Sequence, residues 1–228
     1  MQKTELLYEG KAKKVYATEN PDYCIVSYKD DATAFNGLKK GTIVGKGVVN
    51  NRMSNFMFQL LEKHGIKTHF VEELSDRDTV VRKVSIVPLE VIVRNKAAGS
   101  LSKRLGLEEG TPMRVPVLEF CYKNDDLGDP MVNNYHILAA GFATQEEIDK
   151  ISSMALKVNE LMLEFFKSIG VDLIDFKIDS ARPPTARLSS QTRFPRIPAA
   201  SGTSTPMKSS IRTVSAATWA VWKRLMPK

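Results

Sequence analysis

The amino-acid sequence predicts an α+β fold in which antiparallel strands pack against helices on one side. Three patterns lead to this prediction: short β-prone runs at the start of the chain, two amphipathic helical segments at 44–64 and 142–169, and an alternating strand at 171–179. The 228 residues are enough for one large domain or two small ones with a hydrophobic core.

The β-prone runs at the start predict a meander. Leu6–Tyr8 and Val15–Ala17 flank a lysine-rich turn, and Cys24–Tyr28 follows a second turn at residues 19–22. Further on, Thr79–Arg94 contains two β-branched runs that Pro88 separates. We expect two strands joined at this proline, because proline cannot donate a hydrogen bond within a sheet.

The two helical segments carry start and stop signals. Apolar residues in 44–64 recur at intervals of three and four, and Gly65 follows them as a stop. In 142–169, Thr144 and Glu147 have the spacing of a capping box, and Gly170 follows the last apolar position. Each segment is therefore expected to present one apolar face to a core.

Composition excludes several classes of protein. No stretch reaches the roughly 18 apolar residues of a membrane span, and the N-terminus lacks the apolar segment of a signal peptide. Cys24 and Cys121 are too few for a disulfide framework, so we expect reduced thiols and a cytoplasmic location. The net charge of +7 comes from residues 181–228, which hold 9 of the 33 Lys and Arg and no acids. Because the rest of the chain has a slight acidic excess, nucleic-acid binding is not expected.

Two basic segments could bind anions. The turn Gly10–Lys13 could lay backbone N–H groups and the ammonium groups of Lys11 and Lys13 against phosphates, although a solvated hairpin has the same composition. Arg94 could grip a carboxylate or phosphate near Ser100, or the segment could be a basic loop that opens a helix at Ser100. The residues alone leave these alternatives open.

One strand combines acids with a lysine. Asp175, Lys177 and Asp179 share a face because side chains alternate along a strand. Two carboxylates around a lysine suit Mg²⁺ and phosphate, while an exposed edge strand with alternating charge is the other interpretation. The acidic segment 123–133 is either a lid or metal loop or an ordinary surface loop.

Several segments together resemble the SAICAR synthetase family in order and spacing over residues 1 to about 179. They are YEGKAKKVY, DDATAFNG, KGVVNNRMSNFMF, VPLEVIVRNKAAGSLSKRLG, KNDDLGDPMVNNYH and DLIDFKID. The resemblance implies a small antiparallel N-terminal lobe (1–85), a larger α+β substrate lobe (86–179) and an ATP cleft between them. It also implies a homodimeric, ATP-dependent ligase of purine (IMP) biosynthesis. Such a ligase joins L-aspartate to the carboxylate of carboxyaminoimidazole ribotide through an acyl phosphate.

The resemblance further implies roles for individual residues. Those implied for ATP binding are Gly10, Lys11, Ala12, Lys13, Arg82, Lys83 and Val87. Glu90, Arg94 and Ser100 are implied to hold the ribotide and aspartate, and Asp175 and Lys177 to face the reacting groups. Asp179 stands where the family usually has a glutamate ligand of Mg²⁺. A kinase-like phosphotransferase is the alternative that the same lysines and acids permit.

Residues 180–228 depart from the family, which continues with an ADE-SPD motif and a C-R-x-W-D segment. Loss of one nucleotide near codon 179 accounts for the departure. If Gln191–Ile197 are encoded CAG ACG AGA TTT CCC CGG ATA, regrouping them with a preceding G gives codons for A-D-E-I-S-P-D. The tail 180–228 is therefore expected to be an aberrant segment without native structure, and the chain to have little or no activity.

We predict that the gene carries a one-base deletion near codon 179. Sequencing codons 170–228 should show that one inserted base restores the family's motifs, and mass spectrometry should find the tail as printed. A reading frame in which no single insertion restores those motifs would contradict the prediction.

Overall fold

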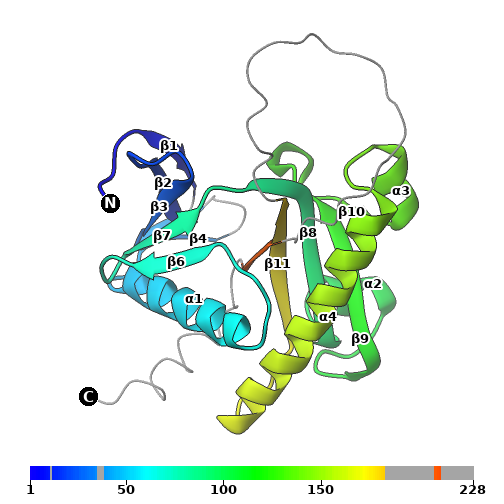
Figure 1. Ribbon diagram of the computed structural model, residues 1–228. Helices are drawn as coiled ribbons and strands as arrows, with labels where there is room; N and C mark the ends of the chain where they lie inside the picture. Colours follow the sequence, from blue (N-terminus) through cyan, green and yellow to red (C-terminus); the bar gives the residue numbers. More distant parts are fainter. Residues whose placement is uncertain (11, 35–38, 183–207, 212–228) are drawn as a thin grey trace, which may run out of the picture.

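Two antiparallel sheets lie side by side in the computed structural model, which describes residues 1–10, 12–34, 39–182 and 208–211 (Figure 1). The first sheet has the strand order β1-β2-β3-β7-β6, the second has the order β10-β9-β8-β11-β12, and β4 pairs with β5. The α+β fold of antiparallel strands expected from the sequence is confirmed. No helix of the described residues is long and apolar enough to cross a membrane.

The elements have the following bounds. The first sheet contains β1 (Leu6–Glu9), β2 (Lys13–Ala17), β3 (Tyr23–Tyr28), β6 (Phe70–Glu73) and β7 (Asp78–Arg82). The second contains β8 (Ser85–Lys96), β9 (Pro112–Tyr122), β10 (Met131–Val132), β11 (Asp175–Arg182) and β12 (Lys208–Ile211). The remaining elements are β4 (Asp31–Ala34), β5 (Lys39–Thr42), α1 (Lys46–Lys63), α2 (Ser100–Leu105), α3 (Asn134–Ala139) and α4 (Gln145–Ser168), with a 3-10 turn at Asp125–Leu127.

Helix α1 packs closely on the first sheet. At its start, the Asp30 carboxylate accepts hydrogen bonds from the backbone N–H groups of Gly45 and Gly47 and forms a bidentate ion pair with Arg77. A Cβ at Gly47 would lie 2.5 Å from Nη1 of Arg77 and 2.6 Å from the carbonyl oxygen of Tyr28, so only glycine fits there. This close contact of Gly47 with Arg77 and Tyr28 sets where α1 begins.

Helix α4 begins and ends as its sequence signals predict. The backbone N–H of Glu147 donates to Thr144 Oγ1 at 3.2 Å, and the Glu147 carboxylate accepts from the Thr144 N–H at 3.0 Å. The capping box is therefore confirmed. At the other end Gly170 adopts φ 69°, a left-handed conformation that stops the helix.

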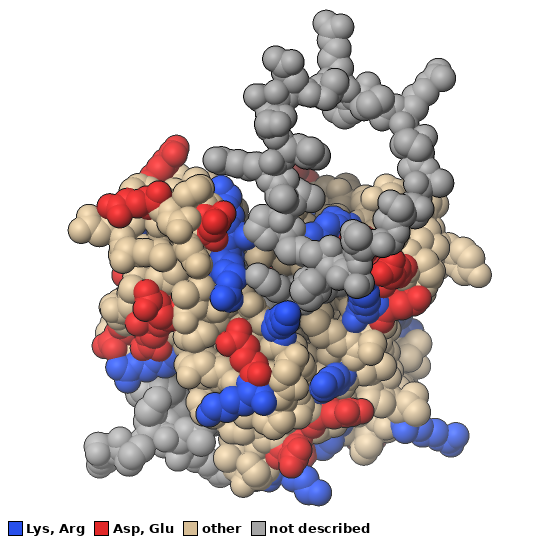
Figure 2. All heavy atoms as spheres, in the orientation of Figure 1, with Lys and Arg blue, Asp and Glu red and all other residues tan. Residues whose placement is uncertain are grey.

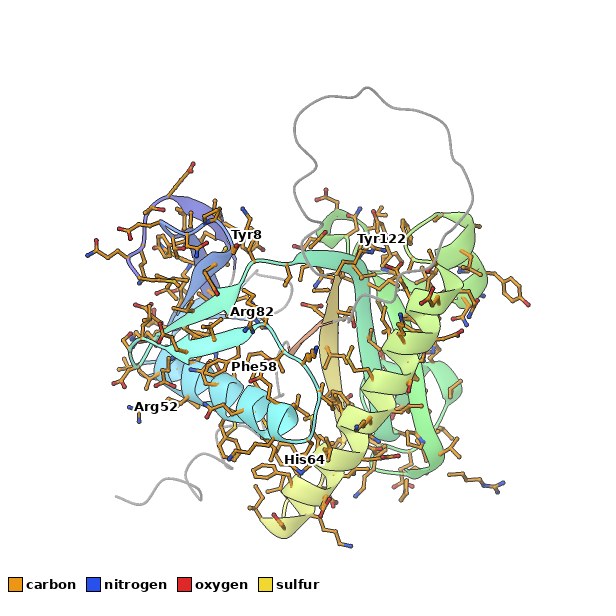
Figure 3. The ribbon with its side chains drawn as sticks, in the orientation of Figure 1. Tyr8, Arg52, Phe58, His64, Arg82 and Tyr122 are labelled. Carbon is orange, nitrogen blue, oxygen red and sulfur yellow. The ribbon has the colours of Figure 1, made fainter. Side chains whose placement is uncertain are left out.

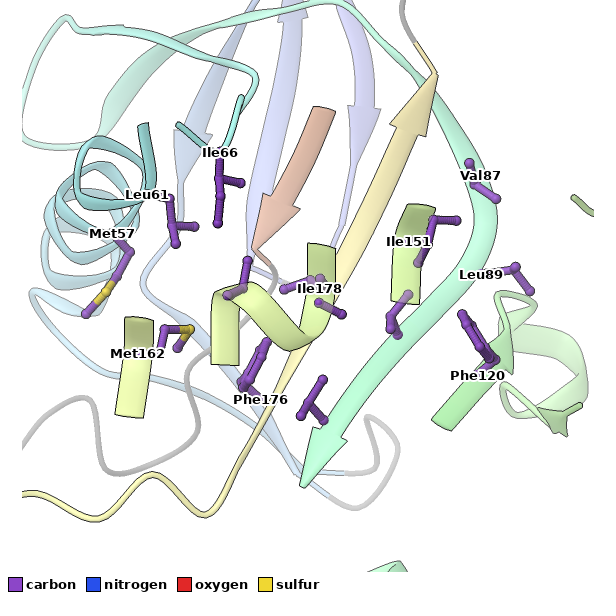
Figure 4. Close-up of a cluster of buried hydrophobic side chains, with 14 of the residues drawn as sticks. Met57, Leu61, Ile66, Val87, Leu89, Phe120, Ile151, Met162, Phe176 and Ile178 are labelled. Atoms are coloured by element: carbon purple, nitrogen blue, oxygen red, sulfur yellow. The ribbon is translucent and has the colours of Figure 1, made fainter. Parts of the chain in front are cut away.

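One hydrophobic cluster joins side chains from both sides of residue 85. α1 and the loop after it contribute Met57, Leu61 and Ile66, which meet α4 and the inner face of the second sheet (Figure 4). The side chains that they meet include Val87, Leu89, Phe120, Ile151, Met162, Phe176 and Ile178. The segments 1–85 and 86–179 therefore share a core, and burial in this core holds the second sheet against α1 and α4.

Strand boundaries differ from expectation in two places. The break between β7 and β8 lies at residues 83–84, and Pro88 lies inside β8. The proline is tolerated because the pairing of β8 with β11 jumps there, from Asp179 opposite Glu90 to Ala181 opposite Ile86. The strand expected at 171–179 is β11, which begins at Asp175 rather than at residue 171. It runs three residues past the expected boundary at 179.

The end of β11 is fixed to the start of α4. Ser180 and Ala181 are buried, and Arg182 donates through Nε and Nη2 to the two carboxylate oxygens of Glu147, at 2.6 and 2.8 Å. Nη2 also donates to the carbonyl oxygen of Phe142. The first residues of the expected tail therefore belong to the folded sheet.

We predict that Arg182→Gln destabilises the protein by about 1 kcal/mol at pH 7, a value already reduced for solvent screening of a partly exposed pair. The Arg182 guanidinium lowers the pKa of Glu147 from its ordinary value of 4.5. The contribution is therefore present above that value and is lost as the pH falls through the lowered pKa. Urea unfolding at pH 7 and at about pH 2.5 should show the difference from the parent shrinking in acid.

Arg114→Gln is the matched control, because Arg114 is exposed on β9 and forms no ion pair within the described residues. It should leave the free energy of unfolding unchanged at both pH values. A loss of stability that is the same for the two variants, or that does not depend on pH, would refute the role given to Arg182.

Candidate active site

Three neighbouring strands of the second sheet carry charged side chains on one face and apolar ones on the other. Asp175 lies opposite Arg94, and Asp179 lies opposite Glu90, which in turn lies opposite Cys121. Residues paired in this way share a face of the sheet. We call this surface the polar face; its charged members are Glu90, Arg94, Glu119, Lys123, Asp175, Lys177 and Asp179.

Arg94 is the most thoroughly bonded residue of the polar face. Its Nε donates to Glu119 at 2.9 Å, its Nη1 to Asp175 at 2.8 Å and its Nη2 to Ser100 at 3.0 Å. Its side chain is only 7% exposed. Ser100 begins α2, so the segment opens a helix as one alternative from the sequence expected, and Arg94 reaches the first residue of that helix.

Lys177 pairs with Glu90. The Lys177 ammonium lies 2.5 Å from Oε1 of Glu90, whose side chain is 7% exposed. The orientation does not meet hydrogen-bond geometry, so within the described residues this buried oxygen is paired by charge alone. A ligand that approaches Lys177, half of which is exposed, meets an ammonium whose partner among the described residues is the Glu90 carboxylate.

Lys123 neutralises Asp179. Its ammonium donates to Oδ1 of Asp179 at 2.7 Å, and the aspartate side chain is 8% exposed. Lys123 begins the acidic segment 123–133, which forms a tight turn: the Asn124 side chain accepts from the N–H groups of Asp126 and Leu127. The segment therefore supplies a cation to the site, and its polar groups largely satisfy one another.

The described residues can hold Mg²⁺ only with help from a ligand. No group of three or more His, Cys, Asp or Glu within them could bind a metal by itself. However, Mg²⁺ commonly uses one or two carboxylates together with substrate phosphates and water. Asp179 and Glu90 lie opposite each other across β11 and β8 and fit that requirement.

The thiol of Cys121 shares the polar face. It is buried beside Glu90, and burial raises its pKa, with a further rise from the Glu90 charge. Both cysteines of the described residues are free and buried. The expectation of reduced thiols fits this arrangement.

The phosphate-binding turn expected near the N-terminus joins β1 to β2. Gly10 donates its N–H to the carbonyl oxygen of Lys13 at 2.9 Å, and Lys29 donates its N–H to that of Ala12 at 2.8 Å. A Cβ at Gly10 would lie 3.0 Å from the Tyr8 ring, which favours glycine. Lys11 lies outside the described residues.

The segment expected to run beside the adenine ring of ATP connects the two sheets. Arg82 ends β7 on the side that faces β8 (Figure 3), and it and Lys83 are exposed. The side chain of Val87 is fully buried in the core. Because the whole residue is 0% exposed, its backbone is buried along with its side chain.

Basic side chains gather in the middle of the view in Figure 2, with acidic side chains beside them. Within the described residues, each acid of the polar face has a lysine or arginine partner. The polar face brings together Glu90, Arg94, Asp175, Lys177 and Asp179, with Ser100 next to Arg94. Glu119 and Lys123 were not expected from the sequence, because their partners lie 25 and 56 residues away.

An α+β fold with lysines and arginines paired to acids on one sheet face is suited to substrates that carry phosphate and carboxylate groups. Comparison with known proteins specifies the family. Residues 6–187 match the family described as SAICAR synthetase. The chain belongs to this family, which confirms the resemblance found in the sequence.

Named relatives support the match. The phosphoribosylaminoimidazole-succinocarboxamide synthase of Lachnoclostridium phytofermentans is 64% identical over 182 residues, which are 80% of this chain and 77% of the relative. Among solved structures, the synthase from Ehrlichia chaffeensis has a TM-score of 0.78 and 44% identity, covering 81% of this chain and 78% of that one. A SAICAR synthetase in complex with ADP has a TM-score of 0.75 and 47% identity, covering 78% and 75%.

The likeness does not extend through the tail. The family match ends at residue 187, so residues 188–228 lie beyond it. Because the alignment covers 77% of the Lachnoclostridium relative, the rest of that protein has no aligned counterpart here. This agrees with a chain whose last segment no longer follows the family.

We predict that Lys123→Met destabilises the protein by about 3 kcal/mol, because it leaves the buried Asp179 carboxylate without a countercharge. Lys123→Met combined with Asp179→Leu should recover most of the loss, since it removes both charges. Urea unfolding of the two single variants and the double variant measures the coupling.

Lys150→Met is the control, because it removes an exposed pair with Glu146 on α4 and should cost about 0.5 kcal/mol or less. Equal losses in Lys123→Met and Lys150→Met would mean that the Lys123 pair is not a buried one.

Proposed function

We propose that the chain has the design of an ATP-dependent carboxylate–amine ligase of purine biosynthesis. The reaction joins L-aspartate to the carboxylate of 5-amino-1-(5-phospho-D-ribosyl)imidazole-4-carboxylate, the carboxyaminoimidazole ribotide, and gives SAICAR. The family match over residues 6–187 carries the proposal. A related structure in complex with ADP supports ATP as the phosphoryl donor.

The chemistry requires activation of a carboxylate. A carboxylate oxygen of the ribotide attacks the γ-phosphorus of ATP, the bond to ADP breaks, and an acyl phosphate forms. The aspartate amine then attacks the acyl carbon, the C–O bond to phosphate breaks with its electron pair, and the amine loses a proton. Positive groups must meet the charge on the phosphoryl oxygens during transfer.

We assign ATP to the space between the N-terminal lobe and the substrate lobe. Gly10, Lys11, Ala12 and Lys13 line the phosphates, and the connection between the sheets passes the adenine. The residues assigned to that connection are Arg82, Lys83 and the segment up to Val87. The position of this connection between β7 and β8 supports the assignment.

We assign the ribotide and aspartate to the polar face. Arg94, Ser100 and Glu90 hold them, and Asp175 and Lys177 face the reacting groups. The Lys177 ammonium is suited to the transferred phosphoryl group, because it is half exposed and has no competing hydrogen bond within the described residues. Its ion pair with Glu90 keeps it in place before a substrate arrives.

Mg²⁺ would be held by Asp179 together with phosphate oxygens of the nucleotide, and it would supply neutralisation of phosphoryl charge. Lys123 is bonded to Asp179 and must then share or release that carboxylate. Asp179 is one methylene shorter than glutamate and reaches less far from β11 than the usual ligand of the family.

We further propose a cytoplasmic protein that acts on small molecules, with no nucleic-acid or membrane partner, and that forms a homodimer. We also propose that the activity of this chain is low, because residues 188–228 lie beyond the family match and the last part of the Lachnoclostridium relative has no aligned counterpart here. The kinase-like alternative is not favoured, since the matching structures are SAICAR synthetases.

The test is an assay of amide formation from ATP, aspartate and the ribotide, run beside the Lachnoclostridium relative. We expect a rate about 100-fold or more below that of the relative, because the loss of roughly 3 kcal/mol of transition-state stabilisation has that effect. Any residual rate should depend on aspartate and disappear in Lys177→Met. A rate equal to that of the relative would contradict the low activity, and ADP release that is independent of aspartate would favour a phosphotransferase.

A further inference from the structure

Glu119 lies between two arginines. Its Oε2 accepts a hydrogen bond from Nε of Arg94 at 2.9 Å, and its Oε1 accepts one from Nη2 of Arg104. The Glu119 side chain is 8% exposed, whereas that of Arg104 is 38% exposed. A buried carboxylate therefore holds one buried and one accessible guanidinium group together.

The contacts of Arg94 leave it few free donors. A guanidinium group has five N–H groups. Those of Arg94 go to Glu119, Asp175, Ser100 and, at 3.5 Å, the carbonyl oxygen of Ala98. One N–H of Nη2 has no acceptor within the described part of the chain. Arg94 can therefore offer a ligand this single N–H while its other contacts stay in place.

Ser100 adds a second donor at the same place. Its Oγ accepts from Nη2 of Arg94, so its own proton is available to a ligand. Arg104 lies one turn further along α2, on the same side as Ser100. Apart from the bond to Glu119, the N–H groups of Arg104 have no acceptor among the described residues. Two cations and a hydroxyl thus converge next to one carboxylate.

We propose that Glu119 is a positioning residue for a phosphate-binding site. By binding Arg94 and Arg104 together, it aims the free N–H of Arg94, the Ser100 hydroxyl and the Arg104 guanidinium at one phosphate. In the proposed function, on which this inference rests, that phosphate is the one on the ribose of the ribotide. A phosphate has enough acceptor oxygens for all three donors, and charge-assisted hydrogen bonds from guanidinium groups to phosphate are strong.

Removing only the charge of Glu119 should disturb this arrangement. In Glu119→Gln the amide oxygen can accept from one arginine, but the amide N–H₂ group then meets the other. The two guanidinium groups would separate, and their directions would no longer be fixed. Glu119→Asp keeps the charge on a shorter side chain and should restore part of the function.

The experiment is calorimetric titration of the full chain with three ligands: the ribotide, the corresponding riboside without phosphate, and Mg·ADP. We expect Glu119→Gln to weaken ribotide binding at least tenfold and to change riboside and ADP binding less than twofold. Glu119→Asp should fall between the parent and Glu119→Gln. Glu108→Gln, which removes an exposed acid with no ion pair in the described region, should behave as the parent.

A loss that is equal for the three ligands would show a structural role only and would overturn the proposal. A second readout separates it from the proposed function: the Nε–H resonance of Arg94, which should exchange slowly in the parent and rapidly in Glu119→Gln. If the parent does not bind the ribotide, the proposed function fails. In that case, unchanged exchange in Glu119→Gln overturns the positioning role, whereas rapid exchange supports it.

Discussion

The arrangement of the polar face depends on the antiparallel pairing of β11 with β8. The register places Asp175 beside Arg94 and Asp179 beside Glu90. The same register turns Phe176 and Ile178 into the core, where both are fully buried. A shift of one residue would send the charges inward and the apolar side chains outward, so burial of the core fixes the arrangement of the polar face.

The polar face is held by its own ion pairs before any ligand arrives. Arg94 has Glu119 and Asp175, Lys123 has Asp179, and Lys177 has Glu90. A buried charge without a partner costs folding free energy. These pairs therefore allow charged side chains to be buried on a face of the sheet. On the proposed assignment, a nucleotide or ribotide that binds here would replace one partner of these cations, and the cations would not have to be moved from water.

Sequence reasoning found the parts of this arrangement that depend on local pattern. Alternation along β11 was enough to put Asp175, Lys177 and Asp179 on one side, and the Thr144–Glu147 box marked the start of α4. Glu119 and Lys123 could not be found in this way, because their roles come from pairing between distant strands. The break expected at Pro88 was wrong, since the irregular register of β8 with β11 accommodates a proline within the strand.

The sequence departs from the family near residue 180, which lies within β11. β11 continues through Ser180, Ala181 and Arg182, which are held by β8 and Glu147. Beyond the strand, residues 208–211 pair with the outer edge of β11 and cover part of its backbone. The residues assigned to the ribotide therefore all lie before the change, whereas residues 188–228 lie beyond the family match. Ground-state binding can persist when interactions made only in the transition state are lost, because the two depend on different contacts. On the proposed assignment, binding of the ribotide and turnover are therefore separate properties of this chain, and each must be measured by itself.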